Sequence, residues 1–272
     1  MKIRDLPRVL GWRSSPREYP YDIETFVLPR EGEIRFAQWR HPLERRKTIL
    51  QARVDALRRF LGEGDVALDI GAHTGDSTLP IALASGSRGA VFAFEPNPFV
   101  FRILAVNASL NPSKTNIVPL MFAAAPEDGW YEFRYSDQGY CNGGLHPGVP
   151  AWRHGHFHRL RVEGRNVSRY LRAEAPAAVA RLRYVKIDAE GADRQVVQSI
   201  GDLIAAARPY LKVEVYRHLP KEERDAFEAD LRRLEYRLFR CGALEEQGEE
   251  LAKGDFNRWT HFDVLAVPAE RV

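Results

Sequence analysis

The sequence predicts an α/β domain with a mostly parallel sheet covered by helices on both faces. From residue 66 onward, short apolar segments alternate with segments of helical periodicity, which is typical of β-α-β units. A loop with two glycines follows the first of these apolar segments, a position that binds cofactors in open α/β sheets. The length of 272 residues is enough for one large domain with additions.

The hydrophobic pattern places the main elements in order along the chain. Strands are expected at 66–70, 90–95, 116–122, 184–188, 210–216, 236–240 and 262–267, and helices at 43–61, 77–84, 98–109, 193–207 and 221–234. We expect residues 1–42 to form an extension packed on the core through its aromatic residues, with short strands at 23–28 and 33–38. Residues 43–272 would then form the main domain.

One stretch breaks the alternation of strands and helices. Segments 131–135 and 158–162 look like additional strands, and the inserted loop 136–157 between them is rich in Gly, Pro and His. A loop of this length inside a compact domain is usually functional, so we interpret it as a candidate lid over the acceptor. His154, His156 and His158 in this region are interpreted as acceptor-binding or solvated residues rather than metal ligands.

The amino-acid composition excludes several classes of protein. The chain has 40 Lys and Arg against 37 Asp and Glu, and this net charge of +3 does not favour a dedicated nucleic-acid binder. Two cysteines exclude a disulfide scaffold and fit a reducing compartment. No apolar run reaches the ~20 residues of a membrane span, and the N-terminus lacks the apolar core of a secretory signal. A cytoplasmic protein is therefore expected, and a homo-oligomer is left open.

The glycine loop favours a nucleoside cofactor without phosphates. The loop reads Asp69-Ile-Gly71-Ala72-His73-Thr-Gly75-Asp76, and Glu95 ends the next strand, where a carboxylate can accept both hydroxyls of a ribose. A dinucleotide fingerprint needs glycine where the chain has His73 and Asp76. Histidine would block a pyrophosphate and aspartate would repel it. S-adenosylmethionine fits better, with Asp69 near its sulfonium and amine.

A second group of charged residues follows the strand at 184–188. Lys186 and Asp188 share one strand face because side chains alternate with period two, and Glu190 follows in the loop. Glu214 ends the next strand. Such a set could deprotonate a hydroxyl, with Asp188 as the base and Lys186 or Glu214 as its partner, or hold Mg²⁺ on Asp188, Glu190 and Glu214. We place the metal-free version first. Asp193 is interpreted as a helix-start acid.

Together, these segments resemble the FkbM family of S-adenosylmethionine-dependent methyltransferases. The resemblance covers about residues 43–241 and is carried by 69–76, Phe94-Glu95-Pro96-Asn97-Pro98, 185–192 and Arg208-Pro209 leading to Glu214. It implies a class I (Rossmann-like) methyltransferase fold with a seven-stranded sheet whose last strand is antiparallel. It also implies methyl transfer to a hydroxyl of a sugar, glycan or polyketide-like small molecule.

The resemblance further implies roles for individual residues. Asp69, Gly71, Ala72 and Gly75 would line the methionine side, Glu95 would bind the ribose, and Asp188 and Glu190 would face the acceptor. Pro96, Asn97, Ala123 and Ala124 would lie near the adenine. His73 stands where an Asn is more usual in the family, which leaves its role open.

Two other functions stay open at this point. A set such as Lys186, Asp188, Lys212 and Glu214 also serves ribose 2′-O-methylation of RNA, although the near-neutral charge disfavours nucleic acid as a partner. A non-catalytic S-adenosylmethionine-binding scaffold is the other alternative, and the presence of Asp188 and Glu190 speaks against it. The expected partner is a small-molecule or glycan acceptor, without a membrane.

Overall fold

The computed structural model describes residues 17–135, 143–144 and 158–271. Most of the candidate lid 136–157 lies outside these ranges, together with His154 and His156. No helix in the described part of the chain is both long enough and apolar enough to cross a membrane.

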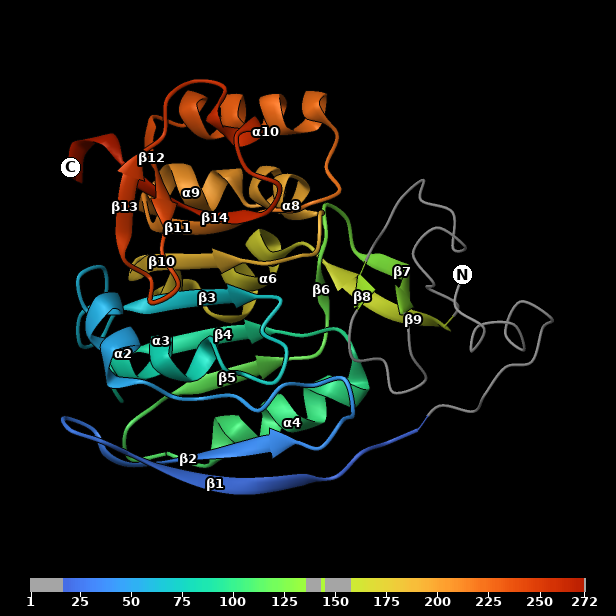
Figure 1. The fold of residues 1–272 in the computed structure, drawn as a ribbon, viewed down its shortest axis with the longest axis vertical. Helices are drawn as coiled ribbons and strands as arrows, with labels where there is room; N and C mark the ends of the chain where they lie inside the picture. Colours follow the sequence, from blue (N-terminus) through green and yellow to red (C-terminus); the bar gives the residue numbers. More distant parts are fainter. Residues whose placement is uncertain (1–16, 136–142, 145–157, 272) are drawn as a thin grey trace.

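The main sheet has eight strands in the described part, in the order β13-β12-β14-β11-β10-β3-β4-β5 (Figure 1). The strands are β3 (Val66–Ile70), β4 (Ala90–Phe94), β5 (Ile117–Leu120), β10 (Leu182–Ile187), β11 (Tyr210–Val215), β12 (Tyr236–Cys241), β13 (Gln247–Glu250) and β14 (Phe262–Pro268). Strands β5, β4, β3, β10 and β11 are parallel, and β14 lies antiparallel between β11 and β12. This order confirms the class I fold and its antiparallel last strand.

The expected count of seven strands was wrong by one edge strand. Strand β13 pairs with β12 and reads Gln-Gly-Glu-Glu, with every residue exposed. A strand with no apolar residue shows no alternation in the sequence, because neither of its faces is buried.

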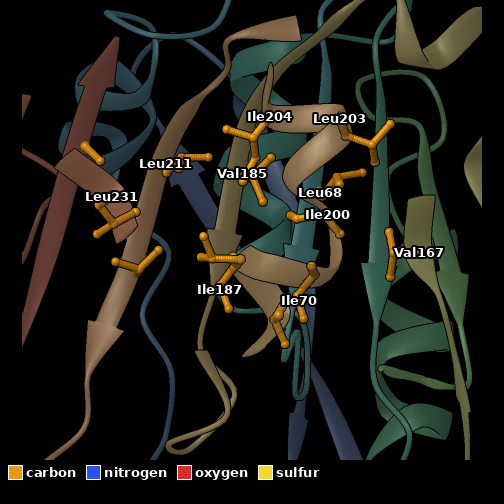
Figure 2. Packing of buried hydrophobic residues seen from close by; sticks show 14 of the residues in the cluster. Leu68, Ile70, Val167, Val185, Ile187, Ile200, Leu203, Ile204, Leu211 and Leu231 are labelled. Atoms are coloured by element: carbon orange, nitrogen blue, oxygen red, sulfur yellow. The ribbon is translucent and has the colours of Figure 1, made fainter. Parts of the chain in front are cut away.

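Helices cover both faces of the sheet. On one face lie α6 (Val167–Glu174), α7 (Pro176–Val179), α8 (Asp193–Ser199), α9 (Gly201–Ala207) and α10 (Lys221–Arg233). On the other lie α2 (Gln51–Leu57) and α3 (Thr78–Ser85), with α4 (Pro98–Ser109) beside them. Two 3-10 turns, η2 (Asp255–Asn257) and η3 (Ala269–Arg271), flank β14. Figure 2 shows how Leu68, Val185 and Leu211 of the strands lie near Ile200, between α8 and α9, and near Leu203 and Ile204 of α9.

Three expected elements differ from the structure. The helix expected at 43–61 is reduced to α2, because Leu43 and Leu50 are 51% and 43% exposed and so do not belong to a buried helix face. The helix expected at 193–207 breaks at Ile200, ahead of Gly201, into α8 and α9. The strand expected at 116–122 ends with β5, and the chain then enters another sheet through β6 (Ala123–Ala124).

An N-terminal hairpin packs against α4. Among the residues that the structure describes, strands β1 (Tyr21–Leu28) and β2 (Gly32–Trp39) pair only with each other. Asn107 of α4 accepts from Ala37 N (2.6 Å) and donates to Ala37 O (3.2 Å), and Asn111 does the same with Arg35 (2.9 and 2.8 Å). Asn107 lies in the last turn of α4, and Asn111 lies just beyond its end at Ser109. The two amides therefore bind the outer edge of β2 as a neighbouring strand would.

A second sheet lies beyond the carboxyl ends of the parallel strands. It has the order β6-β9-β7-β8, with β7 (Gly129–Tyr135), β8 (Gly143–Gly144) and β9 (His158–Arg165). Figure 1 shows it at the side to which the arrowheads of β3, β4 and β10 point. The expected strands at 131–135 and 158–162 are confirmed as parts of β7 and β9.

Candidate functional site

A cavity of about 450 Å³ opens at the carboxyl ends of β3, β4 and β10, beneath the second sheet. Most of the predicted site residues contribute to its wall. These are Gly71, Ala72, His73, Glu95, Pro96, Asn97, Ala123, Ala124, Lys186, Asp188 and Glu190. Asp69, Gly75 and Glu214 do not line it.

The glycine loop packs closely against the end of β4 and the loop that follows β10. Gly71 has φ +77°, and a Cβ there would lie 1.9 Å from the carbonyl oxygen of Asp188. Gly71 N and Ala72 N both donate to Phe94 O, at 3.1 and 3.0 Å. Only glycine permits this turn together with so close an approach of the β10 loop. Gly75, by contrast, faces Leu104 and Asn107 of α4.

Glu95 presents a buried carboxylate to the cavity. Its Oε2 accepts from His73 N (3.1 Å) and its Oε1 from Asn97 N (2.9 Å). Burial raises the pKa of this carboxyl, and His73 and the two N–H groups only partly oppose the rise. Asn97 in turn caps α4 by accepting from Phe99 N (3.0 Å), which fixes the turn after β4. Each carboxylate oxygen keeps a further lone pair for a ligand hydroxyl.

Asp69 lies beneath the cavity and not in its wall. The side chain is 0% exposed. Its Oδ2 accepts from Ser77 Oγ (2.7 Å) and Thr78 Oγ1 (2.6 Å) at the start of α3, and its Oδ1 lies 3.1 Å from Lys186 Nζ. The carboxylate therefore ties β3 to α3 and β10.

Lys186 joins this buried acid to the cavity. Its Nζ donates to Gly71 O (3.0 Å) and lies 3.1 Å from Asp69 Oδ1 and 3.5 Å from Asp188 Oδ2. Burial opposes the charge, but the neighbouring carboxylates outweigh it and raise the pKa of the ammonium, so Lys186 stays protonated. The Asp188 side chain is 43% exposed and lies in the cavity wall.

The loop after β10 is held by a buried acid. Asp193 accepts from Ala189 N (3.2 Å) and Gly191 N (3.1 Å), so it fixes this loop as well as beginning α8. Burial, together with the charge of Asp188, raises the pKa of Asp193 to about 7. Glu190 has φ +51° and reaches the cavity, and burial and Asp188 raise the pKa of its carboxyl.

Glu214 is separated from the cavity. Its Oε1 lies 3.4 Å from His261 Nε2, and its buried Oε2 has no hydrogen-bond partner within the described ranges. Burial and the charges of Asp188, Asp193 and Glu190 raise the pKa of Glu214 to about 10, which favours a neutral carboxyl at pH 7. Among residues 17–135, 143–144 and 158–271, no three His, Cys, Asp or Glu side chains are arranged to hold a metal ion. Asp188, Glu190 and Glu214, the alternative set considered for Mg²⁺, therefore do not form such a group.

Sequence reasoning missed two parts of the wall. Lys47, Arg53 and Asp76 line one end of the cavity, and Tyr131, Phe133 and Tyr135 line another part. The alternation of aromatic residues along β7 was visible as a strand pattern, although its cavity-facing side was not. Lys47 and Arg53 were hidden within the helix expected at 43–61.

The order of the main sheet and a cavity at its strand ends define a class I methyltransferase. The chain matches the family model described as the methyltransferase FkbM domain over residues 69–242. This match spans more than half of the sequence, so the chain belongs to the FkbM methyltransferase domain family, whose members use S-adenosylmethionine. A search of curated proteins gave no match.

Several solved structures are similar at low sequence identity. An FkbM methyltransferase from Methylobacillus flagellatus is 14% identical with a TM-score of 0.43, and the match covers 76% of this chain but only 44% of that protein. Aeropyrum pernix fibrillarin with bound S-adenosyl-L-methionine is 14% identical with a TM-score of 0.46, covering 94% and 98%. A precorrin-6y C5,15-methyltransferase from Geobacter metallireducens is 13% identical with a TM-score of 0.42, covering 85% and 94%. None of these likenesses identifies an acceptor.

Proposed function

We propose that this protein is an S-adenosylmethionine-dependent O-methyltransferase acting on a hydroxyl of a sugar, glycan or polyketide-like small molecule. The observation that carries the proposal is the half-exposed Asp188 carboxylate in the cavity wall, held by Lys186. Asp188 Oδ2 lies 3.5 Å from Lys186 Nζ, and Oδ1 has no partner among the described side chains. One oxygen is therefore oriented by a fixed cation, and the other is free to accept a proton.

The side chains that line the cavity match the chemical groups of S-adenosylmethionine. The Glu95 carboxylate suits a ribose diol, and the small side chains of Ala123 and Ala124 beside Phe94 and Phe122 suit a flat base. S-adenosylmethionine bound here would supply a methyl group already activated on a sulfonium ion. The protein then has to bind the acceptor, exclude water and remove one proton.

The acceptor wall supports a ring-shaped or extended organic alcohol. Tyr131, Phe133 and Tyr135 lie on one face of β7 and line the cavity, together with Gln195 of α8. Aromatic side chains bury a large apolar area, and an amide or tyrosine hydroxyl can orient a polar ligand. In this arrangement Asp188 accepts the hydroxyl proton as the new carbon–oxygen bond forms, and Lys186 stabilises the position of its carboxylate.

Calorimetry and a transfer assay test the proposal together. Wild-type protein should bind S-adenosylhomocysteine, and Glu95→Ala should weaken that binding at least tenfold through the lost charged hydrogen bonds. Asp188→Asn should keep the affinity for S-adenosylhomocysteine, yet lower methyl transfer to an acceptor found among sugar and polyketide alcohols by about 10²–10⁴-fold. Full turnover by Asp188→Asn would place the base elsewhere. A wild type that does not bind S-adenosylhomocysteine would refute the proposed function.

A further inference from the structure

The end of the cavity away from β6 is built in part by residues that precede the family match at 69–242. Ala123 and Ala124 of β6 lie on one side of the cavity, Glu95 follows at the end of β4, and the glycine loop follows at β3. With base and ribose placed at the first two positions, the amino-acid end of the cofactor extends beyond the glycine loop. The wall there consists of Glu44, Lys47, Arg53, Asp76 and Ser77.

We propose that Lys47 and Arg53 bind the carboxylate, and Asp76 binds the ammonium, of the amino-acid end of S-adenosylmethionine. The inference rests on the proposed function, and it assigns ligand-binding roles to two residues outside the family match.

The charges at this end are mixed in a way that suits a zwitterion. Lys47 Nζ lies 3.0 Å from Glu44 Oε1 and 3.4 Å from Asp76 Oδ2, which leaves one of its three N–H bonds for a ligand. Asp76 Oδ1 has no partner in the described part of the chain. Burial opposes ionisation of Asp76, but Lys47, His73 and Arg53 outweigh it and lower the pKa of its carboxyl. A phosphate would meet Asp76 and Glu44, whereas a carboxylate next to an ammonium meets both partners.

Arg53 brings a second cation to the same place. Its Nε and Nη2 donate to Glu245 Oε1 at 3.0 and 2.7 Å, and its Nη1 lies 3.4 Å from Asp76 O. Glu245 also accepts from Lys212 Nζ at 2.9 Å. Protein groups thus engage each of the three guanidinium nitrogens, and the side chain, which lines the cavity, keeps further N–H bonds for a ligand.

Asp76 takes the role that the sequence suggested for Asp69. The contacts of the Asp69 carboxylate with Ser77, Thr78 and Lys186 all lie inside the protein. A ligand ammonium needs an acid that reaches the cavity, and Asp76 lines it with a side chain that is 28% exposed.

Gln38 holds Lys47 in place. Its Oε1 accepts from Lys47 N (2.9 Å) and its Nε2 donates to Lys47 O (2.7 Å), so a buried side chain of β2 binds both backbone groups of residue 47. These two bonds hold the irregular segment around Lys47 against β2. Gln38 is therefore a positioning residue for the lysine.

Binding of three ligands distinguishes a failure of this inference from a failure of the proposed function. S-adenosylhomocysteine carries the whole amino-acid end, its decarboxylated analogue keeps the amine alone, and 5′-methylthioadenosine has neither group. Calorimetry of Lys47→Met should show about tenfold weaker binding of S-adenosylhomocysteine, with the affinities for the other two ligands unchanged. Asp76→Asn should weaken binding of both amine-containing ligands and spare 5′-methylthioadenosine. Lys253→Met, at an exposed lysine outside the cavity wall, is the matched control.

Each outcome decides the matter. Equal losses for all three ligands, or no loss with S-adenosylhomocysteine in Lys47→Met, would overturn the inference. A wild type that binds S-adenosylhomocysteine no better than 5′-methylthioadenosine would overturn it while leaving the proposed function standing. A wild type that binds none of the three would overturn both.

Discussion

The two ends of the cavity are built in different ways. At the strand edge, Lys186 gathers Gly71, Asp69 and Asp188 around one ammonium, and each of these groups lies at the end of β3 or β10. At the N-terminal end, Arg53 meets Glu245 across 192 residues of sequence, and Lys47 depends on Gln38. The first end is assembled from neighbouring strands, and the second from distant segments of the chain.

Burial also differs between the two ends. The Lys186–Asp69 pair has side chains that are 7% and 0% exposed, whereas the Lys47–Asp76 pair is 26% and 28% exposed. A buried pair is costly to break because one charge remains without solvent, and an accessible pair can be rehydrated. The strand edge should therefore govern stability, and the N-terminal end should govern ligand affinity.

The largest expected effect is that of Lys186→Met on stability. Asp69 would be left as an unpaired buried carboxylate, and we expect the free energy of unfolding to fall by about 3–5 kcal/mol. Lys47→Met should cost about 1 kcal/mol or less. Urea denaturation followed by circular dichroism measures both variants.

A second substitution isolates the cause of that loss. Lys186→Met combined with Asp69→Asn removes the buried charge but keeps an acceptor for Ser77 and Thr78, so most of the stability should return. Similar costs for Lys186→Met and Lys47→Met would contradict the difference in burial between the two ends.

The next effect concerns pH and the loop after β10. Asp193 has a pKa raised to about 7 by burial and by Asp188, whereas an unfolded aspartate titrates near 4. The folded state therefore keeps a proton between these values that the unfolded chain has released. The free energy of unfolding should fall as pH rises from about 4 through about 7, by about 4 kcal/mol.

Urea denaturation at intervals from pH 5 to pH 8 tests this dependence. Asp193→Asn should make the decline below pH 7 shallower, because its side chain is neutral throughout the range, while Glu214, with a pKa raised to about 10, keeps part of the decline in both proteins. Asp225→Asn, at an exposed aspartate of α10, should leave the decline in place. An identical pH profile for wild type and Asp193→Asn would show that another group titrates.

The sequence predicted best those features that depend on local signals. Strand 66–70 and helix 98–109 match β3 and α4 at both ends, since an apolar run marks the first, and Asn97 with Pro98 at the first turn marks the second. The strand-end residues Glu95 and Asp188 were placed in the cavity wall by the rule that ligands bind at carboxyl edges.

Features that depend on distant contacts could not be predicted in this way. The spacing of Leu43, Ile49 and Leu50 is helical, yet Gln38 binds both backbone groups of Lys47, and the segment around it is irregular. Asp69 was expected in the cavity because nothing local showed that Ser77 and Thr78 would bind it. Burial of a charge depends on the partners that tertiary structure provides, and those partners have no fixed spacing in the sequence.

The smallest expected effect is that of Gln38→Leu on ligand affinity at the N-terminal end of the cavity. Gln38→Leu removes the two hydrogen bonds that hold Lys47 but touches no residue of the strand edge. We expect roughly threefold weaker binding of S-adenosylhomocysteine, corresponding to part of one hydrogen bond, and unchanged binding of 5′-methylthioadenosine.

The double variant Gln38→Leu with Lys47→Met makes this test decisive. If Gln38 acts by positioning the lysine, then the double variant should bind S-adenosylhomocysteine no more weakly than Lys47→Met alone, because the positioned group is already missing. Additive losses would mean that Gln38 supports the cavity by another route, for example through its contact with Glu24 at 2.9 Å. The N-terminal end would then support the cavity as a whole, and the two ends would differ only in how strongly each affects stability and ligand affinity.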